Sequence, residues 1–274
     1  MRTSVRVKGL AILGLACLVL VIWYAVFRED HAGVLTVSFL NVGERNAIYI
    51  EAPSGRQVLV DGGPDGSVLR ALGVVMPPWD RSLDVVIATS AGQGDVSGLV
   101  DVLQRYAVTM VLQTGVENSS PVWNLFEKEA AATKIITARR GQIMSLGKGA
   151  YLEILSPDRP VPGVSSADGC VVARLVYGKT AFMLPCDAPQ GLENYLAMLD
   201  GPALHSDVVQ LKNVSPIFLG YVSPTYVIYS PSCAKKASPA TSGDVFAKFN
   251  VQTFDTCADG TVTFISDGKT VVRK

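Results

Sequence analysis

Side chains that could perform hydrolytic chemistry are few in this sequence. A hydrolytic zinc site needs three or more nitrogen, sulfur or carboxylate ligands for each metal ion, and an open position for water. The chain has two histidines, His31 and His205, and neither stands at a ligand spacing from other metal-binding residues. His205 precedes a predicted strand, which indicates a surface or capping residue. Histidine therefore gives little support to a zinc hydrolase.

Nucleophilic and phosphate-binding motifs are absent from the sequence. It contains no P-loop, no G-x-S-x-G elbow and no G-x-G-x-x-G fingerprint. Ser90 could act as a nucleophile only beside a histidine or lysine base, and no such base stands at a recognisable spacing. We interpret Ser90 as a turn residue.

Carboxylates offer a weaker metal site. Asp95 and Asp187 could hold Mg²⁺ or Ca²⁺ together with waters, and Cys186 could add a soft ligand. The alternative interpretation of Asp95 is an N-cap for a helix that begins at Val96. Asp61, in the turn Asp61-Gly62-Gly63-Pro64, is predicted to accept hydrogen bonds from backbone donors.

The N-terminal segment predicts a membrane anchor. Residues 9–27 carry no charge over 19 positions, about the length that crosses the hydrocarbon core of a bilayer. Trp23 and Tyr24 stand near the far end, and basic residues precede the segment, which favours a cytoplasmic N-terminus. A cleaved signal peptide is the alternative, and a lipoprotein site at Cys17 fits less well. The predicted order is a basic N-terminus (1–8), a transmembrane helix (9–27), a linker (28–33) and an extracytoplasmic domain (34–274).

Charge gives no support to nucleic-acid binding. The chain has 24 basic and 24 acidic side chains, and without Arg2, Arg6 and Lys8 the remainder has 21 basic against 24 acidic. Nucleic-acid-binding domains usually show a basic excess or stripe. The apolar share of 49% is enough for a sizeable core.

Four cysteines lie in the predicted outer domain, where disulfides can form. Cys233 and Cys257 each follow a predicted strand, and we predict a disulfide between them. Cys170 and Cys186 flank a probable hairpin that turns at Gly178, and for this pair a disulfide and two buried thiols remain open alternatives.

The apolar pattern from Val34 onward predicts one α/β (α+β) domain of two mixed sheets with helices outside. Short strands come first, and strands then alternate with amphipathic helices. Strands are predicted at 34–40, 46–52, 56–63, 83–90, 107–115, 150–157, 207–213, 225–231, 251–256 and 261–268, besides the hairpin between Cys170 and Cys186. Helices are predicted at 96–106, 121–132, 189–200 and 243–249.

Three blocks in order resemble the metallo-β-lactamase domain of the ComEC competence proteins. They are VSFLNVGERNAIYIEAPSGRQVLVDGGP, MPPWDRSLDVVIATSAGQGDVSGL and VQTFDTCADGTVTFISDG. The resemblance covers nearly the whole chain, including the transmembrane segment before the domain. It implies a four-layer αββα metallo-β-lactamase fold, in which active relatives bind divalent metal such as zinc.

The metal-binding motif of that family is degenerate here. In active relatives the loop reads THxDxDHxGG, and here it reads TSAGQGDVSG, from Thr89 to Gly98. The resemblance places one family aspartate, in a G-D-A element, at Asp187. The opening loop is also changed, with Asn41, Glu44, Arg45 and Asn46 in place of acidic and small residues. The former metal-site positions are Ser90, Gly92, Gly94, Asp95, Asp187, Asn213 and Ser238.

Three functions compete on these grounds. The first is a catalytically inactive, membrane-tethered scaffold without a cofactor, which docks another envelope or competence protein. The second is a residual metal-dependent phosphodiesterase or nuclease that acts through Asp95 and Asp187. The third, DNA handling in a competence system, is implied by the resemblance alone and is opposed by the charge and by the altered opening loop.

Overall fold

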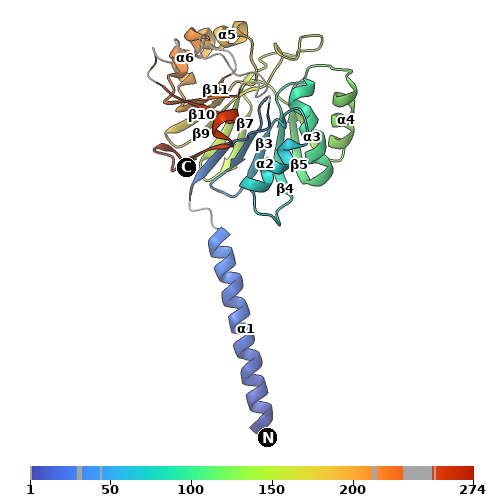
Figure 1. Ribbon diagram of the computed structural model, residues 1–274, viewed down its shortest axis with the longest axis vertical. Coiled ribbons are helices and arrows are strands. Elements are labelled where there is room, and N and C mark those ends of the chain that lie inside the picture. Colours follow the sequence, from blue (N-terminus) through green and yellow to red (C-terminus); the bar gives the residue numbers. More distant parts are fainter. Residues whose placement is uncertain (1, 30–32, 44, 212–214, 231–248, 250) are drawn as a thin grey trace.

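A long N-terminal helix and a two-sheet domain make up the described parts of the computed structural model. It describes residues 2–29, 33–43, 45–211, 215–230, 249 and 251–274. Helix α1 (Arg2–Glu29) stands apart from the domain (Figure 1), and its side chains are described at Lys8 and at positions 12–24.

The predicted membrane segment lies within α1. Among the described residues, no helix has the combined length and apolarity that crossing a membrane requires. Residues 9–11 and 25–27 of the predicted segment fall outside the described side chains, and so does His31.

The first sheet has eight strands in the order β15-β14-β1-β2-β3-β4-β5-β6. Strands β1, β2 and β3 form an antiparallel meander, and β3 to β6 run parallel. The strands are β1 (Leu35–Phe39), β2 (Ile48–Glu51), β3 (Gln57–Val60), β4 (Ser82–Ala88), β5 (Ala107–Gln113), β6 (Lys134–Thr137), β14 (Val262–Ser266) and β15 (Val271–Arg273).

The second sheet has seven strands in the order β13-β12-β11-β10-β9-β8-β7. Its antiparallel part runs from β7 to β10, and β10 to β13 run parallel. The strands are β7 (Ile143–Gly147), β8 (Ala150–Ser156), β9 (Val172–Tyr177), β10 (Thr180–Leu184), β11 (Val208–Leu211), β12 (Tyr226–Tyr229) and β13 (Gln252–Asp255).

Helices cover the outer face of each sheet, as the αββα expectation requires (Figure 1). The first sheet carries α2 (Ser67–Val75), α3 (Gln93–Arg105) and α4 (Pro121–Ala130). The second carries α5 (Gln190–Asp200), the 3-10 helix η1 (Gly201–Leu204) and α6 (Pro216–Val222). A short helix, α8 (Thr256–Asp259), follows β13.

Three apolar layers hold this arrangement together. Between the sheets, alternate residues of β1 and β2 pack against β8 to β10, with Phe39 edge-on to Phe264. Outside the first sheet, Trp123 and Phe126 of α4 pack beside α3. Outside the second sheet, Phe218 of α6 belongs to a third apolar cluster. Burial of such side chains is the main favourable term in folding. The four-layer order therefore follows from strands that are apolar on both faces.

The prediction missed several elements and misplaced one helix start. Strands β6 and β7 are largely exposed and so lack an apolar alternation. Helices α2 and α6 and strand β15 are short, at nine, seven and three residues. Helix α3 begins at Gln93 instead of Val96, with Gly92 at its N-cap, so the proposed capping role of Asp95 is wrong. The helix predicted at 243–249 falls outside the described residues except for position 249.

The cysteine pair that the sequence left open is bonded in the structure. Cys170 and Cys186 form a disulfide, which joins the segment before β9 to the residues after β10. Cys186 therefore has no thiolate to offer as a metal ligand. Cys257 is also disulfide-bonded, and its predicted partner Cys233 lies outside the described residues.

Glu193 of α5 is a buried carboxyl group with a perturbed pKa. Its side chain is almost fully buried, and its Oε2 accepts a hydrogen bond from the backbone N–H of Ser215 at 3.1 Å. Burial raises the pKa of Glu193 from 4.5 to about 7, against the lowering effect of the Ser215 hydrogen bond. Between these two values the folded protein holds a proton that the unfolded chain has released.

We expect the free energy of unfolding to fall as the pH rises through that interval and to level off above about pH 7. The contribution of this group is at most about 3 kcal/mol. Glu193→Gln keeps an acceptor for Ser215 and cannot ionise, so it should be more stable than the wild type near neutral pH and equally stable in mild acid. Urea unfolding at a series of pH values measures how the free energy of unfolding changes with pH in the wild type and in Glu193→Gln. The same pH dependence in both proteins would contradict a protonated Glu193.

Candidate functional site

Loops from both sheets meet at one edge of the sandwich. The loop after β3 carries Asp61, the loop after β4 leads through Ser90 into α3, and the residues after β10 carry Asp187. The segment between β1 and β2 brings Arg45 and Asn46 to the same place, because both contact Asp187. We call this the site edge.

A guanidinium group occupies the centre of the site edge. Arg45 Nη1 lies 2.9 Å from Asp187 Oδ2 and 3.8 Å from Asp95 Oδ1. The side chains of Asp95 and Asp187 are 8% and 17% exposed, whereas that of Arg45 is 39% exposed. A carboxylate that buried needs a cation or hydrogen-bond donors near it. Arg45 supplies the cation to both aspartates.

Glycine makes room for this arginine. A Cβ atom at Gly94 would lie 2.7 Å from Arg45 Nε, so a side chain at position 94 would push the guanidinium out of its present place. Arg45 itself has a φ of 120°, a conformation that L residues rarely adopt. The backbone is therefore held in an unfavourable conformation that places the guanidinium between the two carboxylates.

Hydrogen bonds occupy the other oxygens of these aspartates. Ser90 Oγ donates to Asp95 Oδ2 at 2.5 Å, and Asn46 Nδ2 donates to Asp187 Oδ1 at 3.1 Å. Asn46 in turn accepts from Gln210 Nε2 at 2.9 Å, which links the opening loop to β11 in the second sheet. The site is thus a hydrogen-bonded polar network between the two sheets.

Asp61 supports the loop that leads into α3. Its two carboxylate oxygens accept hydrogen bonds from the backbone N–H and the hydroxyl of Thr89, at 2.8 and 2.6 Å. This confirms the predicted backbone-binding role of Asp61. Burial raises the pKa of Asp61 well above its usual value, and the nearby charge of Asp95 raises it further, against the lowering effect of the Thr89 hydrogen bonds.

The residues of the site edge do not fit a metal ion. Gly92 and Gly94 offer no side chain, Ser90 donates to Asp95, and a guanidinium stands between the two carboxylates. Across the described ranges of the chain, no group of three or more histidine, cysteine, aspartate or glutamate side chains could hold a metal. A divalent ion that bound between Asp95 and Asp187 would have to displace the Arg45 guanidinium. The two positive charges would then lie close together, and they would repel each other.

The structure brings five of the seven former metal-site positions together. Ser90, Gly92, Gly94, Asp95 and Asp187 gather around Arg45, whereas Asn213 and Ser238 lie outside the described residues. His205 is exposed, and its carbonyl accepts a hydrogen bond from Arg174. The resemblance marks Arg45 only as a changed residue and gives it no role. The signal for a role is a basic residue in the opening loop together with two aspartates at former metal-site positions.

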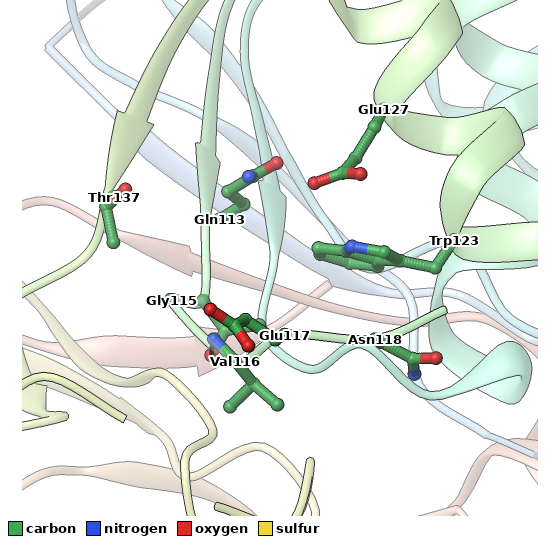
Figure 2. Close-up of a pocket in the computed structure, with 9 residues that line it drawn as sticks. Gln113, Gly115, Val116, Glu117, Asn118, Trp123, Glu127 and Thr137 are labelled. Carbon is green, nitrogen blue, oxygen red and sulfur yellow. Dashed lines mark hydrogen bonds between the residues drawn. The ribbon is translucent and has the colours of Figure 1, made fainter. Parts of the chain in front are cut away.

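A second feature of the site edge is a cavity of about 310 Å³ beside the β5–α4 loop. Figure 2 shows the Glu127 carboxylate directed toward the Gln113 amide, and the Trp123 indole lying between Glu127 and Glu117. Asn118 connects this loop to the site by donating to the carbonyl of Ala91 at 2.7 Å. An indole ring flanked by carboxylates suits a cationic group. Nothing in the sequence pattern singled out this cavity.

Comparison with known proteins identifies the fold. No protein-family model matches this chain, and no curated protein matches its sequence. A mutant of the CmlA beta-hydroxylase superposes with a TM-score of 0.52 at 12% identity, over 81% of this chain and 52% of that one. This chain therefore spans about half the length of the CmlA structure. A metal-dependent hydrolase from Parabacteroides distasonis gives a TM-score of 0.50 at 11% identity, over 81% and 92% of the two chains.

A subclass B3 metallo-β-lactamase from a soil metagenome library also matches, with a TM-score of 0.44 at 14% identity over 64% of this chain and 75% of that one. At such identities a likeness shows the fold alone. The domain has a metallo-β-lactamase-like fold with two sheets and outer helices, which confirms the predicted architecture.

Proposed function

We propose that this chain is a membrane-anchored, non-hydrolytic domain of metallo-β-lactamase-like fold, related to the ComEC-type proteins and serving as an extracytoplasmic scaffold. The observation that carries this proposal is the position of Arg45 between Asp95 and Asp187. A metal-dependent hydrolase needs an open coordination position where the ion activates water. Here the retained carboxylates are engaged by an internal cation.

Anchoring through residues 9–27 is part of the same proposal. The large apolar side chains described in α1, which include Leu15, Leu20 and Trp23, are exposed. Apolar side chains in such numbers on one helix are stable in lipid and costly in water. A scaffold held at the membrane would present the site edge to another envelope protein or to a competence-type channel.

A residual hydrolase is the second candidate, and one observation favours it. Asp187 is a retained family aspartate, Asp95 stands at another former metal-site position, and the two lie on either side of one guanidinium group. If Arg45 moved toward solvent, Asp95 and Asp187 could together bind one metal ion in its place. The two candidates differ in metal content and in turnover.

The test uses the full chain purified in detergent. Metal content is measured by mass spectrometry, and cleavage of a chromogenic phosphodiester is assayed with added Mn²⁺ or Zn²⁺. We expect much less than one metal per chain and no turnover above the level of Asp187→Ala. Stoichiometric metal with turnover that Asp187→Ala abolishes would overturn the scaffold proposal. Asp168→Ala, an exposed aspartate of another loop, is the matched control.

A further inference from the structure

The edge of the sandwich opposite the site edge is where α1 joins the domain (Figure 1). Strand β1 begins there at Leu35, and β4 begins at the same edge because it runs in the same direction as β1. Strand β10 begins there too, because the β9–β10 turn contacts Gly33 and Gly268. Contacts tie the two sheets together at this end, since Tyr177 Oη donates to the Gly33 carbonyl and Lys179 N–H donates to the Gly268 carbonyl. We call this the tether edge.

A large apolar turn projects from the tether edge. Trp79 is 79% exposed and lies in the segment that leads from α2 into β4, and Val74, in the last turn of α2, is 80% exposed. The turn is held in place, because Met76 is buried and Asp80 N–H donates to the Pro77 carbonyl at 3.0 Å. A tryptophan presented to solvent on a fixed turn, next to two prolines, marks a contact surface.

The length of the connection limits how far this edge can lie from α1. Helix α1 ends at Glu29 and the domain is described from Gly33, so only residues 30–32 lie between them. An extended chain spans about 3.5 Å for each residue, so the two ends are separated by at most about 14 Å. The headgroup layer of a bilayer is itself about 5 to 8 Å thick. A domain on so short a connection has to lie against the membrane that holds α1.

Exposed basic side chains also gather at this edge. Five turns or strand starts each present one, namely Arg56, Arg81, Lys148, Lys179 and Lys269. Two acidic residues at this edge, Asp80 and Asp84, are half-buried and accept hydrogen bonds from Gln57. A third, Asp267, accepts hydrogen bonds from backbone N–H groups of its own turn. Lipid phosphates attract such basic groups, and tryptophan prefers the headgroup level.

We propose that the tether edge lies on the surface of the bilayer that holds α1, with Trp79 and Val74 in the headgroup layer. This inference rests on the proposed anchoring of α1. It orients the domain, because the site edge with Arg45 then faces away from the membrane. A partner of the scaffold would therefore approach from the aqueous side.

The experiment uses the full chain in nanodiscs that contain anionic lipid. An environment-sensitive fluorophore is attached at Trp79→Cys in a Cys17→Ser background, and separately at Ile143→Cys, a 66%-exposed apolar residue at the end of β7 that lies away from the tether edge. A third sample carries the fluorophore on the native Cys17 of α1. Quenching is then measured with lipids that carry a quencher at the headgroup, with lipids that carry one at the bilayer centre, where Cys17 would lie, and with iodide in the water phase.

We expect the label at position 79 to be quenched by lipid several-fold more than the label at 143, and to be protected from iodide. Equal behaviour of the labels at 79 and 143, together with lipid quenching at Cys17, would overturn the tether-edge proposal and leave anchoring intact. Absence of lipid quenching at Cys17 would overturn the anchoring itself. Trp79 and Ile143 are both exposed, so neither label disturbs the core.

Discussion

Replacing Gly98 with alanine is expected to lower the free energy of unfolding by about 3 kcal/mol or more, because backbone atoms fill the space that a side chain would need. A Cβ atom at Gly98 of α3 would lie 1.9 Å from the Gly62 carbonyl oxygen and 2.8 Å from that of Asp65. No rotamer change can relieve a contact with backbone. Helix α3 would have to move away from the loop after β3.

This displacement would also disturb the site edge. Gly98 N–H donates to the Gly63 carbonyl at 3.1 Å, and Gly62 N–H donates to the Asp95 carbonyl at 2.8 Å. Shifting α3 breaks the contact that holds Asp95 near Arg45. Urea unfolding of the full chain measures the loss in stability. A variant that unfolds at the wild-type urea concentration would contradict this tight packing.

Gly73→Ala is the matched control. Gly73 lies in α2, and no heavy atom stands within 4 Å of the position that its Cβ would take. Alanine favours the helix over glycine by about 0.5 to 1 kcal/mol, so this variant should be slightly more stable than the wild type. The expected changes in the free energy of unfolding thus have opposite signs at Gly98 and Gly73. The comparison distinguishes the effect of close packing from that of helix propensity.

The second large effect concerns Arg45. Arg45→Ala is expected to lower the free energy of unfolding by about 3 to 4 kcal/mol, because two largely buried carboxylates lose their shared cation. Arg105→Ala removes an exposed arginine whose Nη2 lies 3.9 Å from Asp101, and the expected change is within about 0.5 kcal/mol. Unfolding in urea compares the two variants. Equal losses would show that the Arg45 pair contributes no more than a surface pair.

Arg45→Gly separates the effect of losing the cation from the effect of the backbone conformation at position 45. Glycine adopts a φ of 120° readily, so this variant should recover about 1 kcal/mol relative to Arg45→Ala while lacking the same cation. It also leaves Asp95 and Asp187 without the guanidinium between them. We expect Mn²⁺ to raise the melting temperature of Arg45→Gly and to leave that of the wild type unchanged. Equal shifts in both proteins would show that Arg45 does not exclude the ion.

Much of the fold could be predicted from local pattern, since alternating or continuous apolar runs identified the strands from β1 to β5. Exposed edge strands such as β6 could not be recognised, because their side chains meet solvent and carry no apolar alternation. The local pattern predicts the start of α3 three residues too late, after an aspartate that resembles an N-cap. The buried position of Asp95, which depends on the opening loop far away in sequence, overrides that local preference.

The candidate site also has features that the sequence predicts and features that depend on tertiary contacts. The changes in the loop from Ser90 to Asp95 and the retention of Asp187 can be read from the chain, and both point to a weakened metal site. The pairing of Arg45 with Asp187 spans 142 residues, so no local pattern reveals it. The cavity beside Trp123 likewise depends on how α4 lies against the end of β5.

By itself the sequence determined most of the strands and helices, the uncharged N-terminal segment and the scarcity of metal ligands, because each depends on residue type and spacing along the chain. Only the tertiary structure decided what stands between the remaining aspartates. Two carboxylates drawn together at one edge of two sheets need a compensating charge, and the fold supplies it from Arg45, opposite a glycine that leaves it room. The Cys170–Cys186 disulfide was settled in the same way, by the approach of two segments that sequence spacing alone had left open.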